Sequence, residues 1–293
     1  MSKKSNKYAG DQPAAYDPTG ISEYLGLGRP IDFDKKPVRI AMMCAVAISV
    51  VVTLWKCSTG MDSGAAVVSA LGYALSFLFS YMLALELDPD RQLGGFIGGG
   101  LTLVATYFMG EGNILVMLWL LFILRMLNRS SGDRHRLIDN VIMIGSAAWL
   151  GLQGLWVFPL LTGAAYILES QIQAGYFRSL YPAGISLACL IFAKYDTVAN
   201  ELSMSNIIIM ALAFILFLPE IRVADYVKSK GDKNGKRLLP KRLQTMQGYF
   251  CMMLFSLTFL HGNAIVPSLM PAVGAAAGCG IYLFVALLKH EVF

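Results

Sequence analysis

The chain has 293 residues, of which 56% are hydrophobic and only 15% are charged, and its formal net charge is +5. A soluble protein of this composition would expose large apolar patches, so we exclude an ordinary soluble enzyme or binding module. Because the lysines and arginines lie between apolar runs, their pattern indicates membrane orientation and not a nucleic-acid-binding face.

Residues 1–38 form a polar tail, in which prolines interrupt regular structure and only 20–27 suits a short interfacial helix. Ten apolar runs follow, and each predicts a helix: 40–55, 64–85, 93–109, 113–127, 139–152, 155–168, 180–193, 204–218, 249–261 and 270–288. Several are shorter than the roughly 20 residues that span a bilayer, so some are expected to be tilted or re-entrant. The pattern predicts an all-α polytopic membrane bundle, with residues 39–293 as one transmembrane domain.

The charges orient this bundle. If the tail is cytoplasmic and all ten runs cross, every one of the 24 lysines and arginines except Lys56 and Lys194 is cytoplasmic. Since an excess of basic residues marks that side, we predict ten transmembrane helices in the cell (inner) membrane, with both termini cytoplasmic. Joining the fifth and sixth runs would move the basic 219–248 loop outside, so a hairpin is expected at 151–154. The 219–248 loop either rests on anionic lipids or is a solvated topology signal.

The sequence also suggests an internal duplication. Residues 39–55 align without gaps on 140–156, and 113–129 align on 206–222. Apolar helices share residues by chance, which is one explanation. The other is a 4+4 parallel repeat followed by a final helix pair, and repeat-built transporters often place their site between repeats.

Three carboxylates, Glu86, Asp88 and Asp90, lie within five residues between the second and third runs. Hard oxygen ligands of this kind suit a divalent cation, which is the one cofactor that the sequence suggests. The alternative is structural: Asp88 would cap the third helix, and Asp90 would stabilise its positive end.

Four polar residues are candidates for substrate binding: Arg125, Asn128, Arg129 and His261. Arg125 lies a turn inside an apolar run, so it needs a partner, either a carboxylate of the 86–90 turn or a polar cavity shared with Asn128. Arg125 and Arg129 suit a phosphate or an anionic headgroup, unless they are ordinary cytoplasmic charge. His261 suits a proton relay or ligand contact, unless it is an interfacial residue with a satisfied ring.

Small residues mark a packing face. Gly94, Gly95, Gly98 and Gly99 lie at the start of the third run, and Gly274 and Gly278 repeat the four-residue spacing in the last. Such spacings let helices approach closely in lipid. These faces serve packing within the bundle, or assembly into a homo-oligomer or a membrane complex.

No phosphate-binding loop, zinc-protease pair or nucleophile elbow is present in the sequence. The leading prediction is therefore non-enzymatic, a transporter-like or permease-like bundle for a small solute. An alternative is a membrane enzyme acting on a phosphate-bearing lipid, with the acidic turn holding a metal and the arginines binding phosphate. A third class is a non-catalytic subunit of a membrane complex. A midplane cavity would favour transport, and a polar cleft at the inner leaflet would favour the enzyme.

Overall fold

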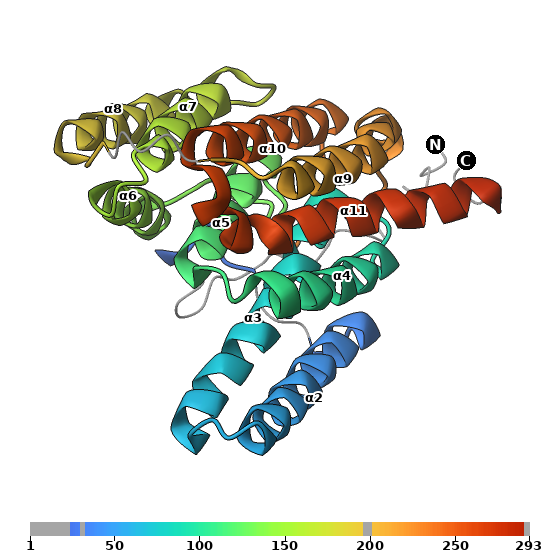
Figure 1. Cartoon of the computed structure of the whole chain (residues 1–293). Coiled ribbons are helices and arrows are strands. Elements are labelled where there is room, and N and C mark those ends of the chain that lie inside the picture. The colour runs from blue at the N-terminus through green and yellow to red at the C-terminus, as the bar shows by residue number, and fades with distance from the viewer. Residues whose placement is uncertain (1–23, 30–32, 196–200, 290–293) are drawn as a thin grey trace, which may run out of the picture.

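The computed structural model describes residues 24–29, 33–195 and 201–289, which form a helical bundle without strands (Figure 1). Its α-helices are α2 (Lys36–Ser58), α3 (Ser63–Leu87), α4 (Leu93–Met109), α5 (Ile114–Asn128), α6 (Leu137–Leu152), α7 (Val157–Gln171), α8 (Leu180–Ala188), α9 (Met204–Val223), α10 (Pro240–His261) and α11 (Val266–Leu288). Short 3-10 turns are η1 (Phe177–Ser179), η2 (Cys189–Phe192), η3 (Ala224–Tyr226) and η4 (Gly262–Ala264). Each α-helix coincides with one apolar run, so the predicted all-α bundle is confirmed for the described residues.

Three predicted boundaries are wrong by five residues or more, and one of them is the end of α8, which lies at Ala188 and not at 193. Helix α10 begins at Pro240, well before residue 249, and α9 continues through Pro219 to Val223. Hydropathy missed the start of α10 because its first turn is basic, although Arg242 there is almost completely buried. The basic loop between these helices therefore spans 224–239 and not 219–248.

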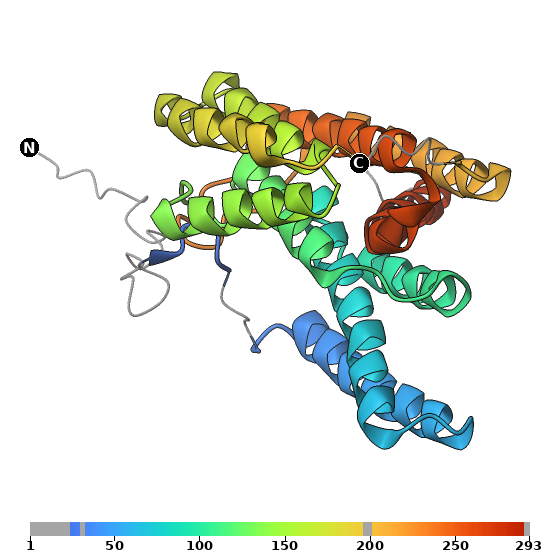
Figure 2. The ribbon, with the colours of Figure 1, turned by 60° about the vertical axis from the view of Figure 1, so that its left-hand side comes forward.

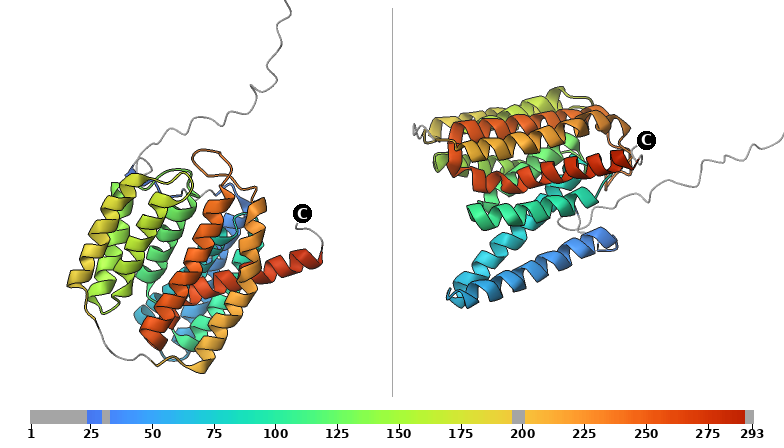
Figure 3. Two further views of the ribbon diagram at one scale, coloured as in Figure 1. Left: turned by 90° about the horizontal axis from the view of Figure 1, so that it is seen from above. Right: turned by 45° about the vertical axis from the view of Figure 1, so that its right-hand side comes forward.

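The helices run alternately between two ends of the bundle (Figure 3). One of them, here called the charged end, comprises residues 24–29, 88–92, 129–136, 172–176 and 224–239, which hydrogen bonds and ion pairs join. At the opposite end, Asn263 Oδ1 accepts from Ser203 N at 3.0 Å, and Ser268 Oγ accepts from Asn113 N at 2.9 Å.

Helices α6 and α7 pack against each other and are joined by a turn in which Gly154 has φ = 96°. A left-handed backbone of this kind suits glycine. The two runs are therefore separate helices joined by a hairpin, as the charge argument predicts.

The α2–α3 hairpin leaves the main body of the bundle (Figures 1 and 2). The second half of α3 packs on α4, α5 and α11, whereas α2 has its main contacts with α3. The most apolar window of α2 is only 17% buried, so most of this helix presents apolar side chains to the surroundings.

Within the described part of the chain, four helical segments are long and apolar enough to cross a membrane: Lys36–Ser58, Ser63–Leu87, Met204–Tyr226 and Val266–Leu288. The shorter helices also expose large apolar side chains, among them Phe108, Trp149, Phe177 and Ile185. A surface of this kind suits contact with lipid better than contact with water.

Helix α4 lies between α3 and α11 because its glycines allow close approach. A Cβ atom on Gly98 would lie 2.8 Å from Gly274 O, and one on Gly94 would lie 3.2 Å from Cys279 Cα. On the other face, a Cβ on Gly99 would lie 2.5 Å from the ring of Phe77. The glycines at four-residue spacing therefore pack against helices of the same chain.

The halves suggested by the alignment differ in their packing. Helix α5 contacts α3, α6 and α10, whereas α9 has its main contacts with α10 and α11. The duplication stays a prediction.

Candidate functional site

Buried ion pairs fill the charged end, and the first of them centres on Glu86 in the last turn of α3. Its fully buried Oε1 accepts from Arg29 Nη1 at 2.9 Å and from Arg125 Nε at 3.1 Å. Arg29 also pairs with Asp232. The predicted contact between Arg125 and a carboxylate of the 86–90 turn is therefore present, and two arginines balance two carboxylates.

Residues 24–29, here called the N-terminal strap, hold this cluster closed. Asp139 in the first turn of α6 accepts from Gly26 N at 2.8 Å and from Leu27 N at 3.2 Å. Lys233 Nζ donates to Leu25 O at 2.8 Å, and Leu27 is completely buried. Residues 25–29 are not helical, so the interfacial helix predicted at 20–27 is wrong for its described part beyond Tyr24. Asp139 accepts hydrogen bonds from the backbone N–H groups that would otherwise bond within such a helix.

The second cluster joins α5, α7 and α10. Glu169 accepts from Arg129 Nε at 3.1 Å and also pairs with Arg242. Arg242 donates further to Gln173 O at 3.0 Å and to Met126 O at 3.2 Å. These bonds hold the start of α10 against the ends of α5 and α7.

The third cluster joins the α3–α4 turn to α9. Arg91 Nη1 lies 3.0 Å from Asp88 Oδ2 and 3.0 Å from Glu220 Oε2. Both carboxylates are buried, and burial raises the pKa of Asp88 above its ordinary value although Arg91 opposes the shift. One guanidinium thus serves two buried carboxylates.

A cavity of about 10 Å³ lies in this third cluster, between the Asp88–Arg91 turn, Glu220 and Gln247. The Gln247 side chain is 1% exposed. Its Nε2 donates to Leu87 O at 2.7 Å, whereas its Oε1 has no hydrogen-bond partner. Polar side chains therefore line the cavity, and one of them, Gln247, has an unused acceptor.

The acidic turn does not converge on one point. Glu86 and Asp88 belong to different clusters, and Asp90 accepts from Lys228 N at 2.7 Å and Ser229 N at 2.8 Å. Among the described residues, no group of three His, Cys, Asp or Glu side chains is arranged to hold a metal. The predicted capping of α4 by Asp88 is wrong, because α4 begins at Leu93 with Gln92 before it, and Asp88 ends α3 instead.

The four candidate substrate-binding residues do not form one site. Arg125 and Asn128 lie beside Glu86, with Asn128 Nδ2 donating to its carbonyl oxygen at 3.4 Å. Arg129 belongs to the second cluster. His261 lies at the opposite end of α10, where its ring stacks on Phe158 with centroids 6.5 Å apart.

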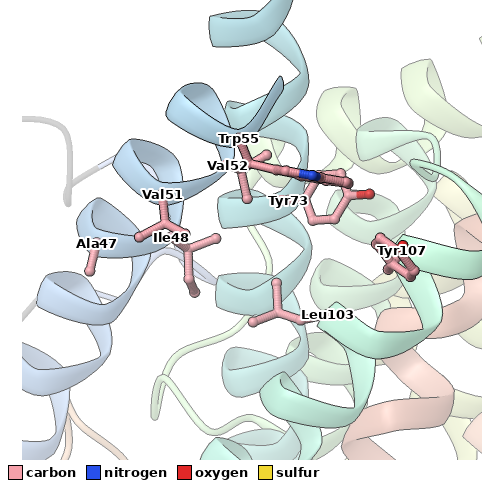
Figure 4. A pocket seen from close by; sticks show the side chains of 8 residues that line it. All are labelled: Ala47, Ile48, Val51, Val52, Trp55, Tyr73, Leu103 and Tyr107. Carbon is pink, nitrogen blue, oxygen red and sulfur yellow. The ribbon is translucent and has the colours of Figure 1, made fainter. Parts of the chain in front are cut away.

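An apolar groove of about 450 Å³, here called the α2–α4 groove, lies between the α2–α3 hairpin and α4 (Figure 4). Its lining residues are Ala47, Ile48, Val51, Val52, Trp55, Tyr73, Leu103 and Tyr107. At the opposite end from the charges, the rings of Trp55 and Tyr107 lie 5.5 Å apart, and Lys56 Nζ lies 5.0 Å from the centre of Trp55. No motif pointed to this groove, since its residues are ordinary apolar ones from three helices.

No protein-family model, curated protein or solved structure matches this chain.

Proposed function

We propose that the protein is a multi-pass integral membrane protein that binds the apolar chain of a lipid in the α2–α4 groove. All ten helices cross the cell membrane, and the charged end lies in the cytoplasm. The observation that carries the proposal is this groove, which is lined by apolar side chains and has a lysine at one end.

The alternation of the helices supports the membrane topology. Every loop that is predicted to be cytoplasmic belongs to the charged end, and the two lysines outside it, Lys56 and Lys194, belong to the other. This distribution follows the rule that basic residues gather on the cytoplasmic side. The exposed Lys228, Lys230 and Lys236 of the 224–239 loop then lie where anionic headgroups would attract them.

A lipid chain is the occupant that best fits the groove. Helix α2, one of its walls, is largely exposed, so in a bilayer the groove opens directly onto hydrocarbon. Trp55, Tyr73 and Tyr107 gather at its outer part, and such amphipathic rings favour the level of the headgroups. Lys56 at the same level offers a positive charge to an anionic headgroup. The volume lies within the range of roughly 300–1,000 Å³ typical of ligand pockets.

Native mass spectrometry of the protein in mild detergent tests the groove. We expect the wild type to retain lipid, and Ala47→Phe or Leu103→Phe to lose it by filling the groove. Val46→Phe is the matched control, because it adds the same ring to the exposed face of α2 beside the groove. Lys56→Gln should reduce the preference for anionic lipid.

Equal lipid retention by Ala47→Phe and Val46→Phe would contradict the proposal. Loss of a dimer without loss of lipid would instead assign the groove to a second protein chain.

Transport of a small solute is the second candidate function. The polar cavity beside Asp88 and Glu220 lies at the charged end and not at the midplane, but its buried ionisable residues still favour transport, because such residues in membrane proteins commonly mark pathways of ions or protons. Uptake measurements in proteoliposomes, comparing wild type with Glu220→Gln, test it. Equal uptake by the two proteins would remove this cavity from any transport pathway.

A further inference from the structure

We propose that the cavity between Asp88, Glu220 and Gln247 binds one monovalent cation, either a sodium ion or a proton. This inference does not depend on the α2–α4 groove, which lies on another part of the molecule. It concerns a binding site built where α3, α4, α9 and α10 meet at the charged end.

The charge balance of the cluster calls for a cation. Arg91 pairs with both carboxylates, so with both ionised these three side chains carry one excess negative charge, and the exposed Asp90 beside them adds to it. Asp88 is 6% exposed and Glu220 is 2% exposed, so water screens this charge poorly. A bound positive charge would neutralise it.

Gln247 supplies an independent sign of a ligand. Gln247 lines the cavity, its amide nitrogen is fixed by Leu87 O, and its Oε1 is a buried acceptor without a donor. A buried acceptor left unpaired is destabilising, and native proteins rarely leave one unused. A sodium ion, or a water molecule beside a protonated carboxyl, would satisfy it.

The size of the cavity limits the class of cation. A volume of about 10 Å³ is close to the smallest that holds one water-sized particle. Magnesium usually keeps several of its waters, which this space does not hold, and calcium would bring two positive charges to a carboxylate pair that Arg91 already half neutralises. A dehydrated sodium ion or a single proton fits.

The ionisable groups around Glu220 determine how readily this site binds a proton. They are Asp88 and Arg91 on the α3–α4 turn and the buried thiol of Cys279 on α11. Arg91 favours the ionised form of Asp88, whereas burial and the neighbouring Asp90 favour the protonated form. Burial also raises the pKa of Asp88, which supports a shared proton at this pair.

Thermal unfolding of the purified full-length protein in detergent tests the proposal. The sodium arm replaces choline chloride by sodium chloride at constant ionic strength and pH. The proton arm lowers the pH from 8 to 6 in choline chloride without sodium. We expect a saturable rise in Tm in one arm, because a ligand that binds only the folded state stabilises it.

Glu220→Gln should abolish that rise by removing one carboxylate without changing the shape of the side chain. Asp225→Asn is the control, since Asp225 follows α9 at the same end but pairs with Gln244 outside the cavity. If Glu220→Gln fails to fold, Gln247→Met removes the free acceptor instead.

A rise in the sodium arm alone, lost in Glu220→Gln, assigns a sodium ion, and a rise in the proton arm alone assigns the proton. Identical responses of wild type, Glu220→Gln and Gln247→Met in both arms would overturn the site. Lipid retention by these same proteins reports on the groove separately, so the two proposals fail independently.

Discussion

Arg125 Nε lies 3.1 Å from Glu86 Oε1, where the last turn of α5 meets the last turn of α3. The same oxygen accepts from Arg29 of the N-terminal strap, so one carboxylate joins two helices to a segment far away in the sequence. Glu86 is completely buried, and charges in such surroundings must be paired to be tolerated.

Glu86→Gln should therefore destabilise the protein strongly. It leaves two guanidinium groups without their shared carboxylate, and breaking a buried ion pair costs about 3–5 kcal/mol. Chemical unfolding in detergent measures this loss, and a double-mutant cycle with Arg125→Gln measures the coupling. Asp133→Asn is the control, because its pair with Arg136 is about one-third exposed and such pairs contribute about 0–1 kcal/mol. Equal losses in the two variants would contradict the central place of Glu86.

Two glycines of α4 should respond differently to the same change. Gly98→Ala places a methyl group 2.8 Å from Gly274 O, so overpacking should cost about 1–3 kcal/mol. A Cβ on Gly100 meets nothing within 4 Å, so Gly100→Ala should be neutral or stabilising by up to about 1 kcal/mol, the helix preference for alanine. Unfolding curves of both variants check this, and comparable destabilisation would argue against close contact of α4 with α11.

Cysteine labelling tests the orientation. In a cysteine-free background, a membrane-impermeant maleimide added to intact cells should label Glu111→Cys but not Lys236→Cys. Both positions are exposed, and they lie at opposite ends of the bundle. After the cells are opened, Lys236→Cys should be labelled as fast as Glu111→Cys. Fast labelling of Lys236→Cys in intact cells would reverse the orientation.

Acid should lower the free energy of unfolding through His135, which lies in the loop before α6. Burial lowers the pKa of His135 to about 4, and its Nε2 lies 2.7 Å from Ser179 Oγ. Between about pH 6.5 and 4, this histidine is protonated in the unfolded chain but not in the folded protein. The free energy of unfolding therefore decreases as the pH is lowered through this range. The loss should reach about 3 kcal/mol at most, from about 1.4 kcal/mol per unit of pKa. His135→Gln should lack this part of the pH dependence, and parallel profiles for both proteins would refute the assignment.

Hydropathy predicted that each helix exists, although not where α10 begins, and it did not predict the site. Apolar runs predicted each helix, and the position of Arg125 inside one predicted its acidic partner. The sequence did not reveal that Arg129 shares Glu169 with Arg242, because these residues come from three separate helices. Asp139 was also missed, since a lone acid in the first turn of a helix usually indicates only a favourable helix end.

The N-terminal strap has a consequence for how the protein is made. Its residues are synthesised first, but Asp139 lies 113 residues after Gly26, and Asp232 lies 203 residues after Arg29. At roughly 5–20 residues per second, ribosomes need on the order of ten seconds or more to reach the last of these partners. Glu86 and Arg125 are therefore both synthesised well before Asp232, the second partner of Arg29. Final closure of the charged end must therefore follow synthesis of the α9–α10 loop, which makes this closure a late event in assembly.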